Sequence, residues 1–187
     1  MSHAYTEIAF TPSVLAVQDR MGTRTRDSTA DAPIRDRLSA RESAFIEARD
    51  GFYQATVSET GWPYVQFRGG PTGFLKVLDD ATVGYADFRG NVQYISAGNL
   101  SADGRVSIIL VDYAHRRRLK LLGHARLIDV MDDPALVERL RVAGYLARIE
   151  RAVLIDVVAF DWNCPQHITP RFTESEFARR SAALTRP

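Results

Sequence analysis

The feature that most constrains this chain is a period-two alternation of apolar and polar residues that begins at Phe52 and recurs along most of the sequence. Such alternation predicts β-strands, because successive side chains of a strand point to opposite faces of the sheet. Most of the predicted strands are joined by tight turns, which pair neighbours antiparallel and exclude a doubly wound parallel sheet. A small antiparallel barrel is the natural closure, since it removes exposed sheet edges. The predicted strands cover residues 52–58, 62–68, 74–78, 82–86, 105–113, 118–130 and 152–162.

Two of these segments carry a more detailed expectation. The continuous apolar run within 105–113 predicts a strand that is buried on both faces. In 118–130, Gly123 indicates a bulge or a bend.

Helices are predicted near the two ends of the chain and in two connections between strands. Their start signals are a proline at the first helical position, or a capping box in which Ser or Thr is followed three residues later by Glu. These signals predict helices over residues 12–21, 40–49, 134–149 and from Thr173 to about Leu184.

Residues 1–37 are expected to form a partly helical arm, not a second domain. Within them, residues 23–37 are polar, mixed in charge and poor in large apolar groups, which is typical of a linker. The remaining residues, 38–187, suffice for one domain with a substantial core.

The charge balance gives no reason to expect nucleic acid or an acidic membrane as a partner. The 24 Lys+Arg and 23 Asp+Glu residues leave a net charge of +1, so any partner must be recognised locally. No apolar run approaches the roughly 20 residues of a membrane span, and the first residues do not resemble a signal peptide, so a cytoplasmic protein is expected. The single cysteine, Cys164, excludes an internal disulfide framework.

The segment RGGPTGFLK, residues 68–76, connects two predicted strands and holds three glycines in nine residues. Glycines let the backbone approach something flat or charged, and Arg68 and Lys76 place a cation at each end. The alternative is a wide loop that contains only bulges.

A second segment, residues 87–100, follows the strand that ends at Ala86. It predicts a turn at Gly90, an N-cap at Asn91 and a short helix with Gln93 in its first turn. The free N–H groups and positive dipole of a helix start suit an anion. The alternative is a capped helix that only connects two strands.

In the basic run 115–120, Arg116 and Arg117 are expected at a solvated hairpin tip. Arg118 and Lys120 lie on one face of the following strand, opposite two leucines, and that face is therefore able to meet a ligand.

Cys164 and His167 belong to the last segment, WNCPQHI. Without further Cys or His nearby, the pair predicts no metal site, and a Cys–His nucleophile lacks a third member.

Taken in this order, these segments resemble the flavin-binding split barrels of the pyridoxamine 5′-phosphate oxidase family. More closely, they resemble a branch marked by RGGPxGFLK, DFRGN-x-QY-x-S-x-GNL, RRRLKLLG and W-N-C-P-x-H-I, from about Phe45 to Phe172. The resemblance implies a mainly β, α+β fold: a six-stranded antiparallel split β-barrel with flanking helices.

By this resemblance, Arg68 and Lys76 match an Arg and a Lys that hold FMN, Arg118 matches a Gln at the flavin, and Trp162 and Arg171 match a Trp and an Arg that line the flavin site. The full set of cofactor-binding residues that it implies is Arg68, Gly69, Gly70, Pro71, Gly73, Phe74, Lys76, Asn91, Gln93, Tyr94, Ser96, Arg118, Trp162 and Arg171.

Two departures from the family pattern matter. The turn at Gly90 falls where the oxidases carry Gly-Ser-Arg-Lys around the FMN phosphate, and Val92 and Gln93 replace both cations. The stretch 167–170 lacks the Arg-x-His that meets the substrate phosphate, so pyridoxamine phosphate is not the expected substrate.

The resemblance therefore implies a homodimer that binds FMN near its interface and exchanges hydride or electrons with a small molecule. Tyr94, Cys164 and His167 are candidates for proton transfer. The alternatives are a deazaflavin-dependent reductase and a flavin or haem carrier or sensor on the same barrel.

Overall fold

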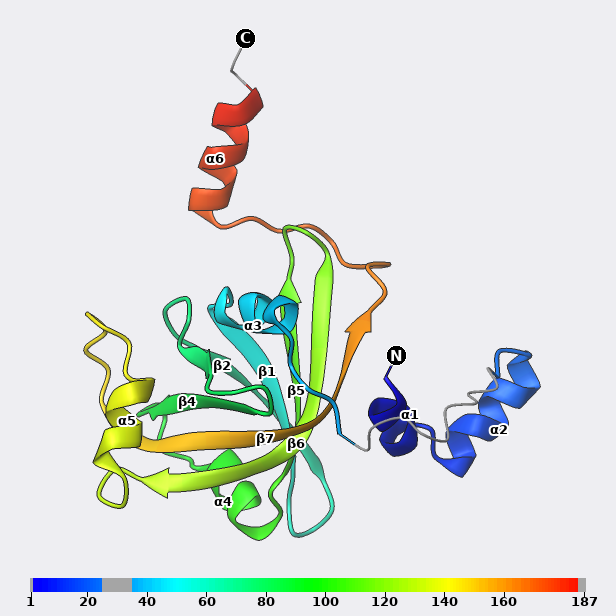
Figure 1. Cartoon of the computed structure of the whole chain (residues 1–187), viewed down its shortest axis with the longest axis horizontal. Helices are drawn as coiled ribbons and strands as arrows, with labels where there is room; N and C mark the ends of the chain where they lie inside the picture. The colour runs from blue at the N-terminus through cyan, green and yellow to red at the C-terminus, as the bar shows by residue number, and fades with distance from the viewer. Residues whose placement is uncertain (1, 25–34, 185–187) are drawn as a thin grey trace.

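The computed structural model describes residues 2–24 and 35–184. Within this part of the chain the strands form one antiparallel sheet of seven strands in the order β2-β1-β5-β6-β7-β4-β3, curled into a barrel (Figure 1). The expected count of six is one too low, because every period-two segment forms a strand, including the three-residue β3. The strands are β1 Gly51–Val57, β2 Pro63–Gly69, β3 Leu75–Val77, β4 Thr82–Phe88, β5 Arg105–Asp112, β6 Arg117–Asp129 and β7 Ile149–Asn163.

Alternation along β5 and β6 builds the barrel interior. Ile108, Leu110, Leu119 and Leu121 are at most 1% exposed and belong to the main apolar core. The intervening residues of β5 are only partly covered, so the prediction that this strand is buried on both faces is wrong. Its alternating burial is the pattern of an antiparallel sheet with one face on the core.

Gly123 marks a bulge, as predicted. The register between β6 and β7 shifts between Leu122 and Gly123, and a Cβ at Gly123 would lie 2.5 Å from the backbone oxygen of Asp156. Close backbone approach therefore requires glycine here.

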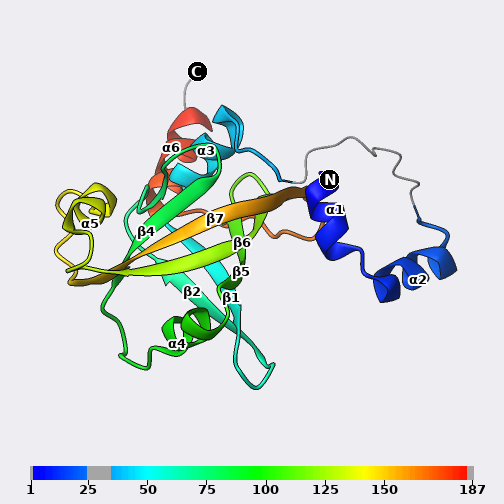
Figure 2. The same ribbon diagram turned by 60° about the horizontal axis from the view of Figure 1, so that its bottom comes forward.

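Two helices close the ends of the barrel (Figures 1 and 2). α3, Ala40–Glu47, begins with the predicted capping box of Ser39 and Glu42 and buries Phe45 and Ile46 in the core. α4, Ile95–Ala102, contributes Leu100 from the opposite end.

α5, Pro134–Leu140, ends nine residues before the predicted end of its helix at residue 149. Arg141 leaves helical geometry with ψ of 144°, and Gly144 has a φ of 75°. The chain turns here because it must return to β7, which begins at Ile149, and the tertiary connection overrides a helical sequence pattern.

The arm before the barrel contains two helices. α1, His3–Ala9, was not among the predicted helices and lies beside the end of β7 (Figure 2). It buries Ala4 and Tyr5 against Ala159 of that strand. α2, Pro12–Met21, matches its prediction and has no buried residue. The predicted linker 23–37 lies largely outside the described residues.

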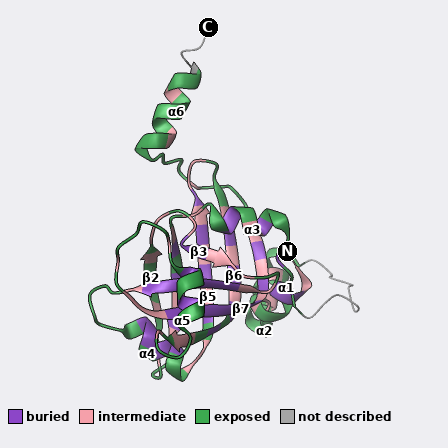
Figure 3. Cartoon of the chain, turned by 60° about the vertical axis from the view of Figure 1, so that its left-hand side comes forward, coloured by how far each residue is buried: buried purple, intermediate pink, exposed green. Residues whose placement is uncertain are grey.

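α6, Glu174–Leu184, has the predicted capping box of Thr173 and Glu176 and stands away from the barrel as an exposed helix (Figures 1 and 3). None of the helices within residues 2–24 and 35–184 is long and apolar enough to cross a membrane.

Candidate functional site

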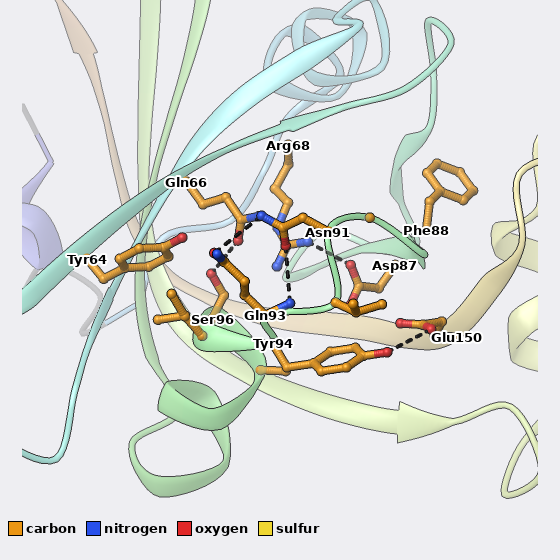
Figure 4. A pocket seen from close by; sticks show the side chains of 14 residues that line it. Tyr64, Gln66, Arg68, Asp87, Phe88, Asn91, Gln93, Tyr94, Ser96 and Glu150 are labelled. Atoms are coloured by element: carbon orange, nitrogen blue, oxygen red, sulfur yellow. Dashed lines mark hydrogen bonds and ion pairs between the residues drawn. The ribbon is translucent and has the colours of Figure 1, made fainter.

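The barrel is split between its two sheet edges, β2 and β3, and side chains bridge this split. Arg68 of β2 donates to Asp87 of β4, with 2.7 Å between Nη1 and Oδ1 (Figure 4). This ion pair joins two strands that share no backbone ladder.

Two adjoining hollows lie on either side of this ion pair, and we call them together the cleft. The larger hollow has a volume of about 260 Å³. The hollows share Gln66, Arg68, Asp87, Phe88 and Gly90. The structure therefore brings together half of the predicted cofactor residues at the cleft: Arg68, Gly69, Phe74, Asn91, Gln93, Tyr94 and Ser96.

The glycine-rich loop, residues 69–73, packs tightly beside the cleft. A Cβ at Gly70 would lie 2.7 Å from Cγ of the buried Phe74, and Gly73 has a φ of 81°. The backbone N–H groups of Gly70 and Gly73 donate to the carbonyl oxygens of Asp50 and Arg49. These glycines are thus required by packing and by the turn itself.

The turn at residues 90–94 differs from its prediction. Asn91 is not an N-cap: α4 begins at Ile95, and Tyr94 occupies the cap position with a φ of 53°. Instead, Asn91 Oδ1 accepts from the backbone N–H of Gln93, closing an Asx turn (Figure 4). Asn favours this local bond over a helical start, so the helix begins three residues later than predicted.

Polar contacts fix the floor of the cleft. Ser96 Oγ donates to Gln66 Oε1 at 2.8 Å, and Tyr94 Oη donates to Glu150 Oε1 at 3.0 Å (Figure 4). Deeper in the barrel, Tyr85 donates to Gln54 at 2.7 Å, and burial raises the pKa of the Tyr85 hydroxyl. Tyr85 therefore remains a neutral donor at physiological pH.

Asp87 lies between two cations. Its second carboxylate oxygen is 3.5 Å from Arg151 Nε. Burial raises the pKa of Asp87, and it outweighs the opposing effects of Arg68 and Arg151. The cleft therefore contains a carboxylate whose ionisation depends on these two guanidinium groups.

The other predicted cofactor residues lie outside the cleft. Lys76 is paired with Gly84 in the β3–β4 ladder. Trp162 donates from its indole N–H to Glu42, 2.7 Å away, and so ties β7 to α3. Arg171 lines a separate hollow of about 540 Å³, to which Thr72 of the glycine-rich loop also contributes. Pro71 precedes Thr72 and lines none of these hollows.

Arg118 is also distant from the cleft within one chain. It is paired with Asn163 at one end of β7, whereas Asp87 is paired with Arg151 near the other end of the same strand. As predicted, its neighbours Leu119 and Leu121 enter the core, and its Nη2 donates to the Cys164 carbonyl at 3.0 Å.

Cys164 and His167 follow β7 in an exposed segment. Among the residues that the structure describes, no group of three His, Cys, Asp or Glu side chains is arranged to hold a metal ion. Of the three candidates for proton transfer, Tyr94 alone lines the cleft.

Four charged residues at or beside the cleft were not predicted: Asp87, Arg89, Glu150 and Arg151. Asp87 begins the DFRGN motif, so its position beside the glycine turn was a usable signal. Glu150 and Arg151 precede an apolar strand as ordinary flanking charges, and only the pairing of β7 with β4 brings them to the cleft.

Two buried guanidinium nitrogens lack a partner. In the described part of the chain, three buried side-chain polar atoms have no hydrogen-bond partner: Gln54 Nε2, Arg68 Nε and Arg118 Nε. A buried unpaired donor is unfavourable, so such atoms commonly mark the place of a missing ligand or water.

The described strands thus form a split barrel whose cleft is bordered by Gly69 and Gly90. The sequence matches the pyridoxamine 5′-phosphate oxidase family over residues 38–163, well over half of the chain. The chain belongs to this family, which confirms the resemblance seen in the sequence.

Solved structures show the same fold. HupZ from Group A Streptococcus is 16% identical with a TM-score of 0.55, over 72% of this chain and 100% of that one. A putative pyridoxamine 5′-phosphate oxidase from Lactobacillus delbrueckii is 17% identical with a TM-score of 0.51, over 67% and 93% of the two chains. A conserved hypothetical protein from Mycobacterium tuberculosis, Rv2991, is 17% identical with a TM-score of 0.51, over 75% and 94%. No curated protein matches the sequence.

Proposed function

We propose that this chain is a cytoplasmic, homodimeric flavoprotein that binds FMN in the cleft and acts as an oxidoreductase on a small molecule. The observation that carries the proposal is the pair of unpartnered, buried guanidinium nitrogens on Arg68 and Arg118. Both residues are ones that the family resemblance assigns to the cofactor, and a phosphate supplies the acceptors that they lack.

The residues of the cleft fit the parts of FMN. Arg68 and the side-chain amides of Asn91 and Gln93 suit a phosphate, while the aromatic wall of Phe74 and Phe88 suits a flat ring. When bound, the flavin supplies the hydride or electron transfer, and the protein supplies binding and orientation. Because residues 167–170 lack the Arg-x-His motif, we do not propose pyridoxamine phosphate as the substrate.

A dimer supplies what one chain leaves incomplete. Arg118 and Arg171 lie away from the chain's own cleft, so we assign them to the cleft of the partner. The outer sheet face supports this assembly: Phe67 and Val65 of β2 are 58% and 60% exposed, and Phe67 pairs directly with Tyr53 of β1. An apolar face of this kind is typical of a subunit interface.

The dimer is testable through Val65. In solution, the protein is expected to have about twice the 20.9 kDa mass of one chain. Val65→Lys places a charge on the proposed interface and is expected to shift the mass towards the monomer and to release the cofactor, as measured by light scattering and absorbance. Met131→Lys is the control, because Met131 is 83% exposed on the loop before α5. A wild-type monomer that retains FMN contradicts the assembly.

The cofactor is testable by titration. We expect FMN to bind at least roughly tenfold more tightly than riboflavin, because the phosphate gains charge-assisted hydrogen bonds. FAD is expected to bind poorly, since the chain has no G-x-G-x-x-G unit for a pyrophosphate. Equal affinity for riboflavin and FMN would mean that the phosphate is not recognised. The absorption spectrum of the purified protein separates a flavin from a deazaflavin or a haem.

A further inference from the structure

A chain of alternating charges runs across the split of the barrel. Arg68 binds Asp87 at 2.7 Å, Asp87 lies 3.5 Å from Arg151, and Arg151 lies 3.5 Å from Glu150. Glu150 accepts from the hydroxyl of Tyr94 at 3.0 Å (Figure 4). The Arg151 guanidinium lies 5.2 Å from the centre of the Tyr94 ring. The contacts connect β2, β4, β7 and the residue before α4.

The inner members of this chain are largely withdrawn from water. The side chains of Asp87, Glu150 and Arg151 are 10%, 14% and 21% exposed. Ion pairs at this depth are weakly screened by salt, and their geometry is held more firmly than that of a surface pair. They are therefore suited to fixing the positions of the groups at either end.

Both ends of the chain face the cleft. At one end, Arg68 uses Nη1 for Asp87 and keeps a buried Nε without a partner. At the other, Tyr94 holds a left-handed backbone with a φ of 53°, and Val92 has a φ of 55°. Two non-glycine residues in this region within three positions are unfavourable, so contacts elsewhere must hold the turn in place. The Tyr94 hydroxyl bond to Glu150 is one such contact.

We propose that Asp87, Arg151 and Glu150 are positioning residues that hold Arg68 and the turn at 91–94 at a fixed separation for the cofactor phosphate. The inference rests on the proposed FMN site and goes beyond the residues that the family resemblance assigns. Because Arg68 and the turn at 91–94 are already held in place, binding does not have to pay the entropy of ordering them. It also explains how the site binds a phosphate although Val92 and Gln93 offer no cation.

Tyr94→Phe tests the far end of the chain. The substitution removes one hydroxyl and no charge, so FMN is expected to bind roughly two- to tenfold more weakly while the Kd of riboflavin stays unchanged. Riboflavin lacks the phosphate, so an equal loss for both ligands overturns the proposal, as does no loss for either. Failure of the wild-type protein to bind FMN would instead refute the proposed function itself.

Glu150→Gln tests the middle of the chain against a matched control. It weakens the contacts to Tyr94, Arg151 and Arg89, whose Nε lies 3.8 Å from Glu150 Oε1. It is expected to reduce the preference for FMN over riboflavin about as much as Tyr94→Phe. The control is Glu138→Gln, which alters an ion pair with Arg141 that is exposed to solvent. If both variants change the preference equally, the effect is not specific to the chain and the proposal fails.

Asp87→Asn separates positioning from simple repulsion by the sign of its effect. If Asp87 acted only through its charge, neutralising it would remove a repulsion towards phosphate and tighten FMN binding. If Asp87 orients Arg68, the weaker acceptor loosens the guanidinium, and FMN binding weakens roughly three- to tenfold. Tighter binding by this variant overturns the positioning role.

Discussion

Arg68→Met is expected to weaken FMN binding by about 10–150-fold and to destabilise the fold at the same time. The first effect is the loss of a charge-assisted contact to phosphate, worth roughly 1.5–3 kcal/mol. The second arises because Asp87 stays buried with only Arg151, 3.5 Å away, as its partner. Breaking a buried pair costs about 3–5 kcal/mol, and the remaining cation places this variant near the lower end of that range.

The pH dependence of this destabilisation identifies its cause. Burial already raises the pKa of Asp87, and loss of Arg68 raises it further. A carboxyl whose pKa is higher in the folded state binds protons more readily there, so folding is penalised above that pKa and the penalty fades as the pH falls through it. Urea unfolding should therefore show that the free energies of unfolding of variant and wild type differ less at about pH 5 than at about pH 7. A gap that is independent of pH would contradict a role for the Asp87 charge.

Arg105→Met is the matched control for both effects. Arg105 forms an ion pair with Asp103 at the surface, 71% exposed and away from the cleft. Surface pairs contribute little to stability, so neither the FMN affinity nor the free energy of unfolding is expected to change measurably.

The fold was largely predictable because its strands alternate cleanly. β6 shows why: Leu119 and Leu121 could only enter the core together, which placed Arg118 and Lys120 on the other face. The failures arose where tertiary connections decide local structure. α5 stops at Leu140 because the chain must reach β7, a requirement that no local pattern records.

The candidate site was predictable only in part, for two physical reasons. Local motifs located Arg68, Asn91 and Tyr94 beside the cleft, because glycine turns constrain the backbone that carries them. Glu150 and Arg151 were missed, because the ion pairs that connect them to the cleft form only when β7 pairs with β4. The helix-capping preference of Asn also gave a wrong prediction for Asn91. Its side chain closes an Asx turn instead, and α4 begins at Ile95.

The last prediction concerns Arg118, whose place at the far end of β7 makes the proposed site one that two subunits share. Arg118→Gln is expected to weaken FMN binding by about 10–150-fold if the guanidinium meets the phosphate, or to lower the reduction potential of the bound cofactor if it lies by the ring. We favour the phosphate role because Val92 and Gln93 replace two cations that the family pattern places around the phosphate. If the variant keeps the FMN affinity and the reduction potential of the wild type, Arg118 does not contact the cofactor.

Mixed dimers decide whether Arg118 acts across the interface. In a dimer of one Arg68→Met chain and one Arg118→Gln chain, a site shared between subunits combines both substitutions in one cleft and leaves the other cleft with both native arginines. Such a dimer should bind one FMN with wild-type affinity, although neither parent homodimer does. If Arg118 instead served its own chain, each cleft would carry one substitution, and no wild-type site would appear. Titration of the purified mixed dimer, with each homodimer as the reference, therefore assigns Arg118 to one chain or the other by counting tight sites.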